Sequence, residues 1–256
     1  MADARPGFVA PGSGDFFFDP IFGNSILFTK PVLLIFLSVL LISSLFYLAA
    51  RKAEIVPGRL QFAGEMVYSF VRNDIGRDVI GPEYKKFVPF LFAIFTFVLT
   101  NNLFGIIPLI QFPTMSHIGF PIALTIFVYF TFHTVAIRRQ GLGNYLKHML
   151  FMPGVPKVMY VILAPLELAT YFLIRPLTLA MRLFGNMFAG HLLLILFTLG
   201  GEYMLHDQVF MKAMSVFSFG FSVGFTFFEF FVQCLQAYIF TLLSALYISE
   251  ALSEGH

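Results

Sequence analysis

A group of charged and polar side chains interrupts an otherwise apolar run at residues 158–199. The group lies in the segment RPLTLAMRLFGNMFAGH and comprises Arg175, Thr178, Arg182, Asn186 and His191. The first four fall at offsets 0, 3, 7 and 11, which places them within an arc of roughly 80° on a helix. An arginine within a membrane costs roughly 2.5–3.5 kcal/mol by insertion scales, so it faces protein or water and is a functional candidate. Because a guanidinium keeps its proton, Arg182 is a permanent cation suited to attract a mobile carboxylate.

A second polar row lies on the last apolar run, residues 213–248. Its members fall within about 60° on a helix and are Ser215, Ser218, Ser222, Glu229, Gln233 and Gln236. Such a row indicates either a wet path or an interface in which Ser and Gln hydrogen-bond neighbouring helices, and both readings stay open for the serines. Glu229 is a stronger candidate, because a buried carboxylate needs a partner or water.

His191 is the candidate partner of Glu229, since an imidazole titrates near neutral pH and suits proton relay. The alternative is a structural histidine at a helix end. On an ideal helix His191 lies about 160° around from Arg175, away from the arginine row. This separation favours two aqueous routes over one continuous pore.

The composition of the whole chain indicates an integral membrane protein. Hydrophobic residues make up 58% and charged residues 12%, against about 25% charged residues in an ordinary soluble domain. The net charge of +2 does not suggest nucleic-acid binding. The sequence holds no zinc-protease or phosphate-loop motif, its histidines lack paired metal-ligand spacing, and its single Cys234 leaves no disulfide within one chain. We expect no cofactor, no metal and no enzymatic activity on this chain.

Hydropathy predicts an all-α membrane protein with five crossings. The first three spans are expected at residues 31–50, 87–110 and 120–137, and each is long enough or nearly long enough to cross the hydrocarbon layer. Between the first two, residues 55–86 predict an amphipathic helix lying on the membrane surface. A soluble linker helix packed on a partner is the alternative. Asn101 and Asn102, polar within the second span, are expected to serve packing rather than line a vestibule.

The last two crossings are predicted to form a hairpin of two long, steeply tilted helices. The run 158–199 would be roughly 63 Å long as a helix, about twice the hydrocarbon thickness, so it tilts steeply or breaks near Pro165 or Pro176. We expect a polar loop at 138–157 and a turn at 200–212. The chain then divides into an outer segment at 1–26, three spans with loops at 27–157, and the hairpin at 158–256.

The distribution of basic residues predicts the orientation. Segments 51–86 and 138–157 hold eleven of the 16 Lys and Arg residues, and loops rich in these residues stay on the cytoplasmic side. This rule places the N-terminus outside and the C-terminus in the cytoplasm.

Two stretches resemble the signature segments of subunit a of F-type ATP synthases: RLFGNMFAGH at Arg182–His191 and LQAYIF at Leu235–Phe240. The resemblance covers nearly the whole chain, including KKFVPFLFAIFTFVLTNNLFGIIP, RRQGLGNYLK and EALSEGH. It implies a proton-translocating stator subunit whose hairpin faces a rotating ring of small proteolipid subunits, each with one carboxylate at mid-membrane. It also implies a peripheral-stalk subunit b, a link through the stalk to the catalytic head, and a bacterial plasma membrane.

The resemblance assigns roles to individual residues. Arg182 matches the arginine that attracts the ring carboxylate, and Gln236 the glutamine facing it. Asn186, His191 and Glu229 match positions of the outer half-channel. Glu167 resembles an acid of the inner half-channel but lies nine residues before Pro176, where eight are usual. Arg175 often corresponds to a lysine and is taken as a helper that snorkels or pairs with lipid or Glu167; Thr178 and Gln233 are accessory.

Two other function classes remain as alternatives. A stand-alone proton channel or secondary ion transporter would use the same intramembrane charges, but transporters usually show internal repeats and broken helices. The sequence shows no repeat, and the 36 uninterrupted residues of the last apolar run argue against this class. A membrane scaffold gives no reason to keep Arg182 and Glu229 in apolar helices.

Overall fold

The structure, a computed structural model, describes residues 11–12, 29–51, 54–107, 110–150, 159–205 and 209–253. Every regular element in these ranges is a helix. The helices are α1 (Lys30–Arg51), α2 (Arg59–Phe70), η3 (Val71–Ile80), η4 (Tyr84–Lys86), α3 (Val88–Leu103), η5 (Thr114–Ser116), α4 (Gly119–Gln140), α5 (Leu142–Leu150), α6 (Tyr160–Ala169), η7 (Thr170–Ile174), α7 (Arg175–Leu205) and α8 (Val209–Ser253).

The apolar helices confirm the prediction of an all-α membrane protein. In the described part of the chain, four helical stretches are long and apolar enough to cross a membrane, namely Lys30–Arg51, Gly119–Gln140, Ile162–Leu205 and Phe210–Leu252, and Val88–Leu103 is a shorter apolar helix. These five correspond to the five expected crossings. The expected outer segment at 1–26 lies outside the described residues, apart from 11–12.

The helix boundaries follow local chemistry. Pro89 lies in the first turn of α3, where its missing N–H costs no hydrogen bond. At the other end of α4, Gly141 adopts a φ of 78° and its N–H donates to the Ile137 carbonyl, a left-handed termination that glycine favours. Arg138 and Arg139 occupy the last turn of α4, where cations complement the helix dipole.

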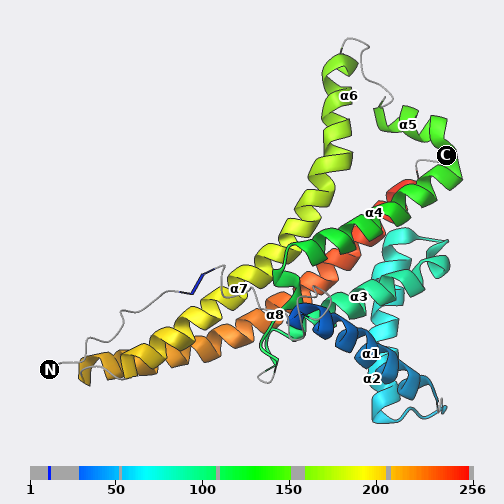
Figure 1. Cartoon of the computed structure of the whole chain (residues 1–256). Coiled ribbons are helices and arrows are strands. Elements are labelled where there is room, and N and C mark those ends of the chain that lie inside the picture. Colours follow the sequence, from blue (N-terminus) through cyan, green and yellow to red (C-terminus); the bar gives the residue numbers. More distant parts are fainter. Residues whose placement is uncertain are drawn as a thin grey trace.

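Helices α7 and α8 pack side by side along most of their length and form a long rod (Figure 1). On one side of this rod, α3, α4 and η3 pack against α8. The principal core lies there and includes the fully buried Leu91, Val128, Phe240 and Ile248. Lipid is as apolar as these side chains, so close packing rather than exclusion of water holds the helices together.

The first long helix of the hairpin bends without breaking. Pro165 lies inside α6 and Pro176 in the first turn of α7, and the helix is continuous between them through the π-helical turn η7. Pro176 cannot donate to the carbonyl four residues earlier, and a π-helical turn is a common accommodation of such a defect. In Figure 1, α6 rises from the rod at a different angle from α7. The predicted break is therefore a bend.

Two predicted loops are partly helical, which corrects the sequence reading. Residues 142–150, assigned to a polar loop, form α5, and the hairpin turn is shorter than residues 200–212 because α7 runs to Leu205 and α8 begins at Val209. The amphipathic segment after the first span also forms helices, α2 and η3. Val71 and Ile75 of η3 are buried in the core, while α2 is largely exposed.

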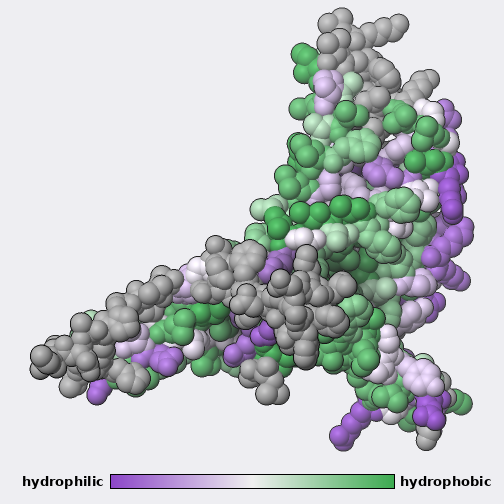
Figure 2. Space-filling view, in the orientation of Figure 1, coloured by the Kyte–Doolittle hydropathy of each residue, from purple (hydrophilic) through white to green (hydrophobic). Residues whose placement is uncertain are grey.

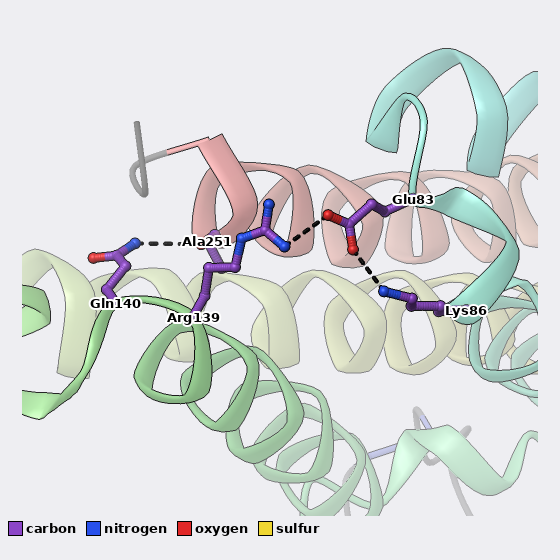
Figure 3. A network of polar contacts seen from close by, with 5 residues as sticks. All are labelled: Glu83, Lys86, Arg139, Gln140 and Ala251. Carbon is purple, nitrogen blue, oxygen red and sulfur yellow. Dashed lines mark hydrogen bonds and ion pairs between the residues drawn. The ribbon is translucent and has the colours of Figure 1, made fainter.

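An exposed polar network joins three segments near the C-terminal end of α8 (Figure 3). Glu83 accepts hydrogen bonds from Lys86 Nζ at 2.9 Å and from Arg139 Nη1 at 2.7 Å. Gln140 Nε2 donates to the Ala251 carbonyl at 3.3 Å. The hydrogen bond from Lys86, followed by that from Arg139, lowers the pKa of Glu83 below its ordinary value. The network ties the end of α4 to the η4 turn that precedes α3 and to the last turn of α8.

Space-filling colours show that apolar side chains cover most of the visible helical surface, with hydrophilic residues gathered at the edges (Figure 2). Most of the exposed α1 and α8 side chains are Leu, Val or Phe, such as Phe36, Leu40, Phe227 and Phe231. An apolar exterior of this extent fits lipid or neighbouring membrane subunits rather than water.

Candidate functional site: a polar seam in the helical hairpin

Arg182 projects from an exposed position on α7. Among the described residues, no side chain forms an ion pair or hydrogen bond with it. One turn further along, Asn186 Nδ2 donates to Gln236 Oε1 on α8 at 2.7 Å. This bond brings together two stretches that lie fifty residues apart, so the free guanidinium sits beside a fixed amide pair.

Glu229 is buried at 3% exposure on the side of α8 that faces α7. Its Oε1 accepts a hydrogen bond from Gln233 Nε2 at 3.1 Å. A Cβ placed on Gly190 of α7 would lie only 3.2 Å from the same oxygen. The missing side chain of Gly190 is therefore what allows the carboxylate to lie against α7.

His191 is also buried, at 5% exposure, but it is not the hydrogen-bond partner of Glu229. Its imidazole lies near the backbone of Gln111, in the loop before α4. Gln111 has a φ of 41°, a strained value for a residue other than glycine. The expected direct pair is thus wrong: Gln233 reaches Glu229 from one turn away on the same helix, and His191 forms no hydrogen bond with this carboxylate.

Several buried polar atoms around Glu229 have no protein partner in the described part of the chain. They are Asn102 Oδ1, Glu229 Oε2, Gln233 Oε1 and Gln236 Nε2. The Asn102 side chain does donate to the Gln233 carbonyl at 3.3 Å, which links α3 to the seam. Because buried polar atoms are nearly always satisfied, such a cluster calls for water in the seam.

The three serines of the predicted polar row on α8 bond to α7, which supports the interface reading over the wet path. Ser215 Oγ donates to the Gly201 carbonyl at 2.6 Å and Ser218 Oγ to the Phe197 carbonyl at 2.7 Å. The hydroxyl of Ser222 lies 3.0 Å from that of Thr198. These contacts fasten the far half of the hairpin.

The asparagines of the second span serve packing, as expected. Asn101 donates to Ser38 Oγ on α1 at 3.0 Å and accepts from Thr114 Oγ1 at 2.8 Å. With the bond from Asn102 to α8, the two side chains hold α1, the 114–116 turn and α8 around α3.

Arg175 pairs with Glu250 at 2.7 Å, so of the roles expected for it the pairing with Glu167 is wrong. Glu167 is half-buried on α6 and has no ion pair within the described ranges. Thr178 is exposed, and its hydroxyl donates to the Arg175 carbonyl at 3.0 Å. The arginine row therefore divides: Arg175 turns toward the end of α8, while Thr178 and Arg182 stay exposed.

Glu250 and Tyr171 are the residues that sequence reasoning missed. Tyr171 OH donates to Glu250 Oε1 at 2.7 Å, beside the Arg175 pair. A signal for Glu250 existed, because a guanidinium in an apolar helix needs a counter-charge and Glu250 is one of two acids on α8. The contact between Arg175 and Glu250 could not be read from the sequence, because the two residues lie 75 positions apart.

The chain matches known sequences over nearly its whole length. A family model described as "ATP synthase A chain" matches residues 32–249. The chain belongs to this family. It is 44% identical to an ATP synthase subunit a of Nocardioides sp. over 98% of this chain and 95% of that protein. Identity is 41% with the subunit a of Streptomyces lividans over 98% and 90%, and 36% with that of Rhodococcus erythropolis over 96% and 90%.

Membership of the ATP synthase A chain family confirms the resemblance carried by the two signature stretches. The family is the proton-channel subunit of F-type ATP synthases, so the chain is a multi-pass membrane component of such a complex. A stand-alone channel or transporter is not favoured. In this family setting, the seam between α7 and α8 is the candidate proton-translocating site.

Proposed function

We propose that this chain is a non-catalytic stator subunit whose α7–α8 hairpin loads and unloads protons on a rotating proteolipid ring. The observation that supports this most directly is Arg182, a permanent cation on the exposed face of a membrane helix with no partner among the described residues. An unpaired charge there is costly unless a second molecule supplies the counter-ion. A ring carboxylate at the same depth would do so.

Around Arg182, the seam would form the outer route for protons. Glu229 and Gln233 carry buried oxygens that need water, and Asn186 and Gln236 continue the polar line to the arginine. His191 lies one residue from the glycine that Glu229 touches. A proton would pass along these groups to an ionised ring carboxylate next to Arg182.

Once neutralised, the ring carboxyl loses its attraction to Arg182 and enters the lipid, where a charged group would be too costly. Rotation would bring another carboxyl toward the inner route, for which half-buried Glu167 on α6 is the candidate acid. Arg182 blocks a direct leak between the routes because its charge repels protons. Each charge that crosses yields about 2.3 kcal/mol per 100 mV, and several per turn drive synthesis on other subunits.

The proposal includes the setting of the chain. Its N-terminus lies outside, its C-terminus in the cytoplasm of a bacterium, and the membrane is the plasma membrane. Its partners are the proteolipid ring, the peripheral-stalk subunit b and, through the stalk, the catalytic head. No bond is made or broken on this chain other than by proton transfer.

The test is ATP-driven proton pumping in inverted membrane vesicles that carry Arg182→Ala. Subunit content of the purified complex is measured first, so that loss of assembly is separated from loss of transport. We expect an assembled complex that does not pump. Normal coupled pumping by assembled Arg182→Ala would overturn the proposal. Leu177→Ala, an exposed apolar change on the same helix, is the control and should pump normally.

A further inference from the structure

Glu250 closes a compact cluster where the end of α8 meets the junction of η7 and α7. One carboxylate oxygen accepts from Arg175 Nη1 at 2.7 Å and the other from Tyr171 OH at 2.7 Å. The Arg175 guanidinium also lies 4.0 Å from the ring centroid of Tyr171 and 5.7 Å from that of Tyr247. Arg175 is thus paired by charge and held between aromatic rings, at 27% side-chain exposure.

Arg175 and Arg182 are the two formal cations of α7, and their positions are closely related. Seven residues separate them, which is two helical turns, about 10 Å along the axis and about 20° around it. The Cα atoms of Arg175 and Arg182 therefore lie on the same face of α7. Only the side chains differ: Arg175 turns to Glu250, whereas Arg182 stays exposed.

We propose that Glu250 is a positioning residue for proton transfer, because it neutralises Arg175 and holds that guanidinium away from the face that Arg182 presents. This inference rests on the proposed function. It means that a ring carboxylate moving past α7 meets one uncompensated cation instead of two. Release from the arginine site is then set by protonation alone.

Coulomb's law gives the expected size of the effect. At about 10 Å and an effective dielectric constant of about 20, one uncompensated charge changes an equilibrium constant by roughly tenfold. Without Glu250, Arg175 would offer the ionised carboxylate a second resting place two turns from Arg182. Each ring step would then wait for the carboxylate to leave an unproductive position.

The experiment compares initial rates of ATP-driven pumping in inverted vesicles that hold the whole complex. Glu250→Gln removes the charge but keeps a carbonyl oxygen that Tyr171 can use, and we expect a loss of roughly tenfold with normal assembly. Arg175→Gln combined with Glu250→Gln removes both charges and should recover most of that loss. Recovery is decisive when the two variants assemble equally and have equal thermal stability, because a merely structural ion pair would recover pumping only together with stability.

Tyr171→Phe is the control for the hydrogen bond between Tyr171 and Glu250. It removes the hydroxyl bond to Glu250 but leaves the ion pair with Arg175 in place. We expect pumping close to that of the natural chain. A loss in Tyr171→Phe equal to that in Glu250→Gln would mean that the contact, not the charge, matters, and would overturn the inference.

Two other outcomes overturn the inference while leaving the proposed function intact. These are natural pumping by Glu250→Gln, and a double variant no faster than Glu250→Gln alone. Assembled Arg182→Ala vesicles in the same series report on the proposed function itself, since full pumping there overturns the role of the hairpin. The two failures are therefore distinguishable in one set of membranes.

Discussion

Gly190 on α7 and Glu229 on α8 lie in close contact at the polar seam. A methyl group on residue 190 would lie 3.2 Å from Glu229 Oε1 and 3.4 Å from Cδ, so the carboxylate would have to move. The end of a glutamate side chain moves easily, so the fold should survive while the hydrogen bond from Gln233 is disturbed. The position of Glu229 thus depends on the absence of one side chain.

Gly190→Ala should therefore assemble normally and reduce proton flux by up to about tenfold, because small displacements of proton-transfer groups are costly. Flux is measured in vesicles stripped of the catalytic head. Gly200→Ala on the same helix is the matched control, since no atom lies within 4 Å of its added Cβ. Equal fluxes in the two variants would refute the placement of Glu229 at the seam.

Glu229→Gln keeps the size of the side chain but removes its ability to exchange a proton. We expect proton flux in the same stripped vesicles to fall by about 10²-fold or more, the usual contribution of a positioned acid–base group. Gln233→Leu removes the hydrogen bond to Glu229 and should cause a smaller loss. Unchanged flux in Glu229→Gln would remove this residue from the path.

The sequence was most informative about which individual residues are functional candidates. Arg182, Asn186 and Glu229 stand out because polar groups are rare in apolar helices, and the structure brings Asn186 to Gln236. The surroundings of His191 could not be foreseen, because they include the backbone of a loop that is distant in the sequence. The same holds for Glu250, whose contact with Arg175 depends on where two long helices end relative to each other.

The two long helices carry distinct polar sections. Ser215, Ser218 and Ser222 fasten the far half of α8 to α7, and Glu229, Gln233 and Gln236 follow on the same side. Helical periodicity predicts this common face, but it does not distinguish a wet path from an interface. The difference lies in whether the neighbouring helix supplies an acceptor, which only the packed structure shows.

Ser218→Ala should consequently leave proton flux unchanged and slightly lower the heat stability of the purified complex. Its hydroxyl donates to a helix carbonyl, and such bonds in membrane proteins contribute about 0.6 kcal/mol on average. Thermal unfolding in detergent and proton flux in vesicles are the two measurements. A marked fall in flux with unchanged stability would instead support a wet path through the serines.

The ion pairs of Glu83 make a pH-dependent contribution to the stability of the helix ends that they join. Contacts with Lys86 and Arg139 lower the pKa of Glu83 below its ordinary value of 4.5. The stabilisation is therefore present above that value and is lost as the pH falls through the lowered folded-state pKa. The natural chain should unfold at a slightly higher temperature than Glu83→Gln at pH 7, and the gap should close as the pH falls through the lowered pKa of Glu83. A gap independent of pH would contradict this.

At the element scale, the sequence predicted the helices better than their ends. Hydropathy located all five apolar helices, because length and composition decide whether a segment can span. It assigned α5 to a loop because charged residues mask a short amphipathic helix. It also treated Pro165 and Pro176 as possible breaks, where a π-helical turn keeps the helix continuous.

The whole molecule presents one rod, α7 with α8, supported along one side by α3, α4 and η3 (Figure 1). Arg182 lies on an exposed part of this rod. The packing of α3, α4 and η3 keeps the seam closed around Glu229, while the face of α7 that carries Arg182 remains accessible to a moving partner. A stator that works against a rotor needs this combination of a fixed inner seam and an open outer face.

The proposed orientation is testable with two matched glycines. Gly119 and Gly143 are exposed, and an added Cβ meets no atom within 4 Å at either position. In a Cys234→Ser background, we expect a membrane-impermeant maleimide to label Gly143→Cys in inverted vesicles and Gly119→Cys in right-side-out vesicles. The reverse labelling pattern would contradict the proposed orientation and would place the N-terminus in the cytoplasm.

The central claim is that the Arg182 face of α7 meets the ring, and cysteine cross-linking tests it most directly. Thr178 lies one turn from Arg182 and is exposed, whereas neighbouring Leu177, also exposed, points about 140° away from Arg182 on the helix. In a Cys234→Ser background, Thr178→Cys should form a disulfide with a ring subunit carrying a cysteine near its acidic residue, and Leu177→Cys should not. Cross-linking from Leu177→Cys alone, or from neither position in an assembled complex, would contradict the account.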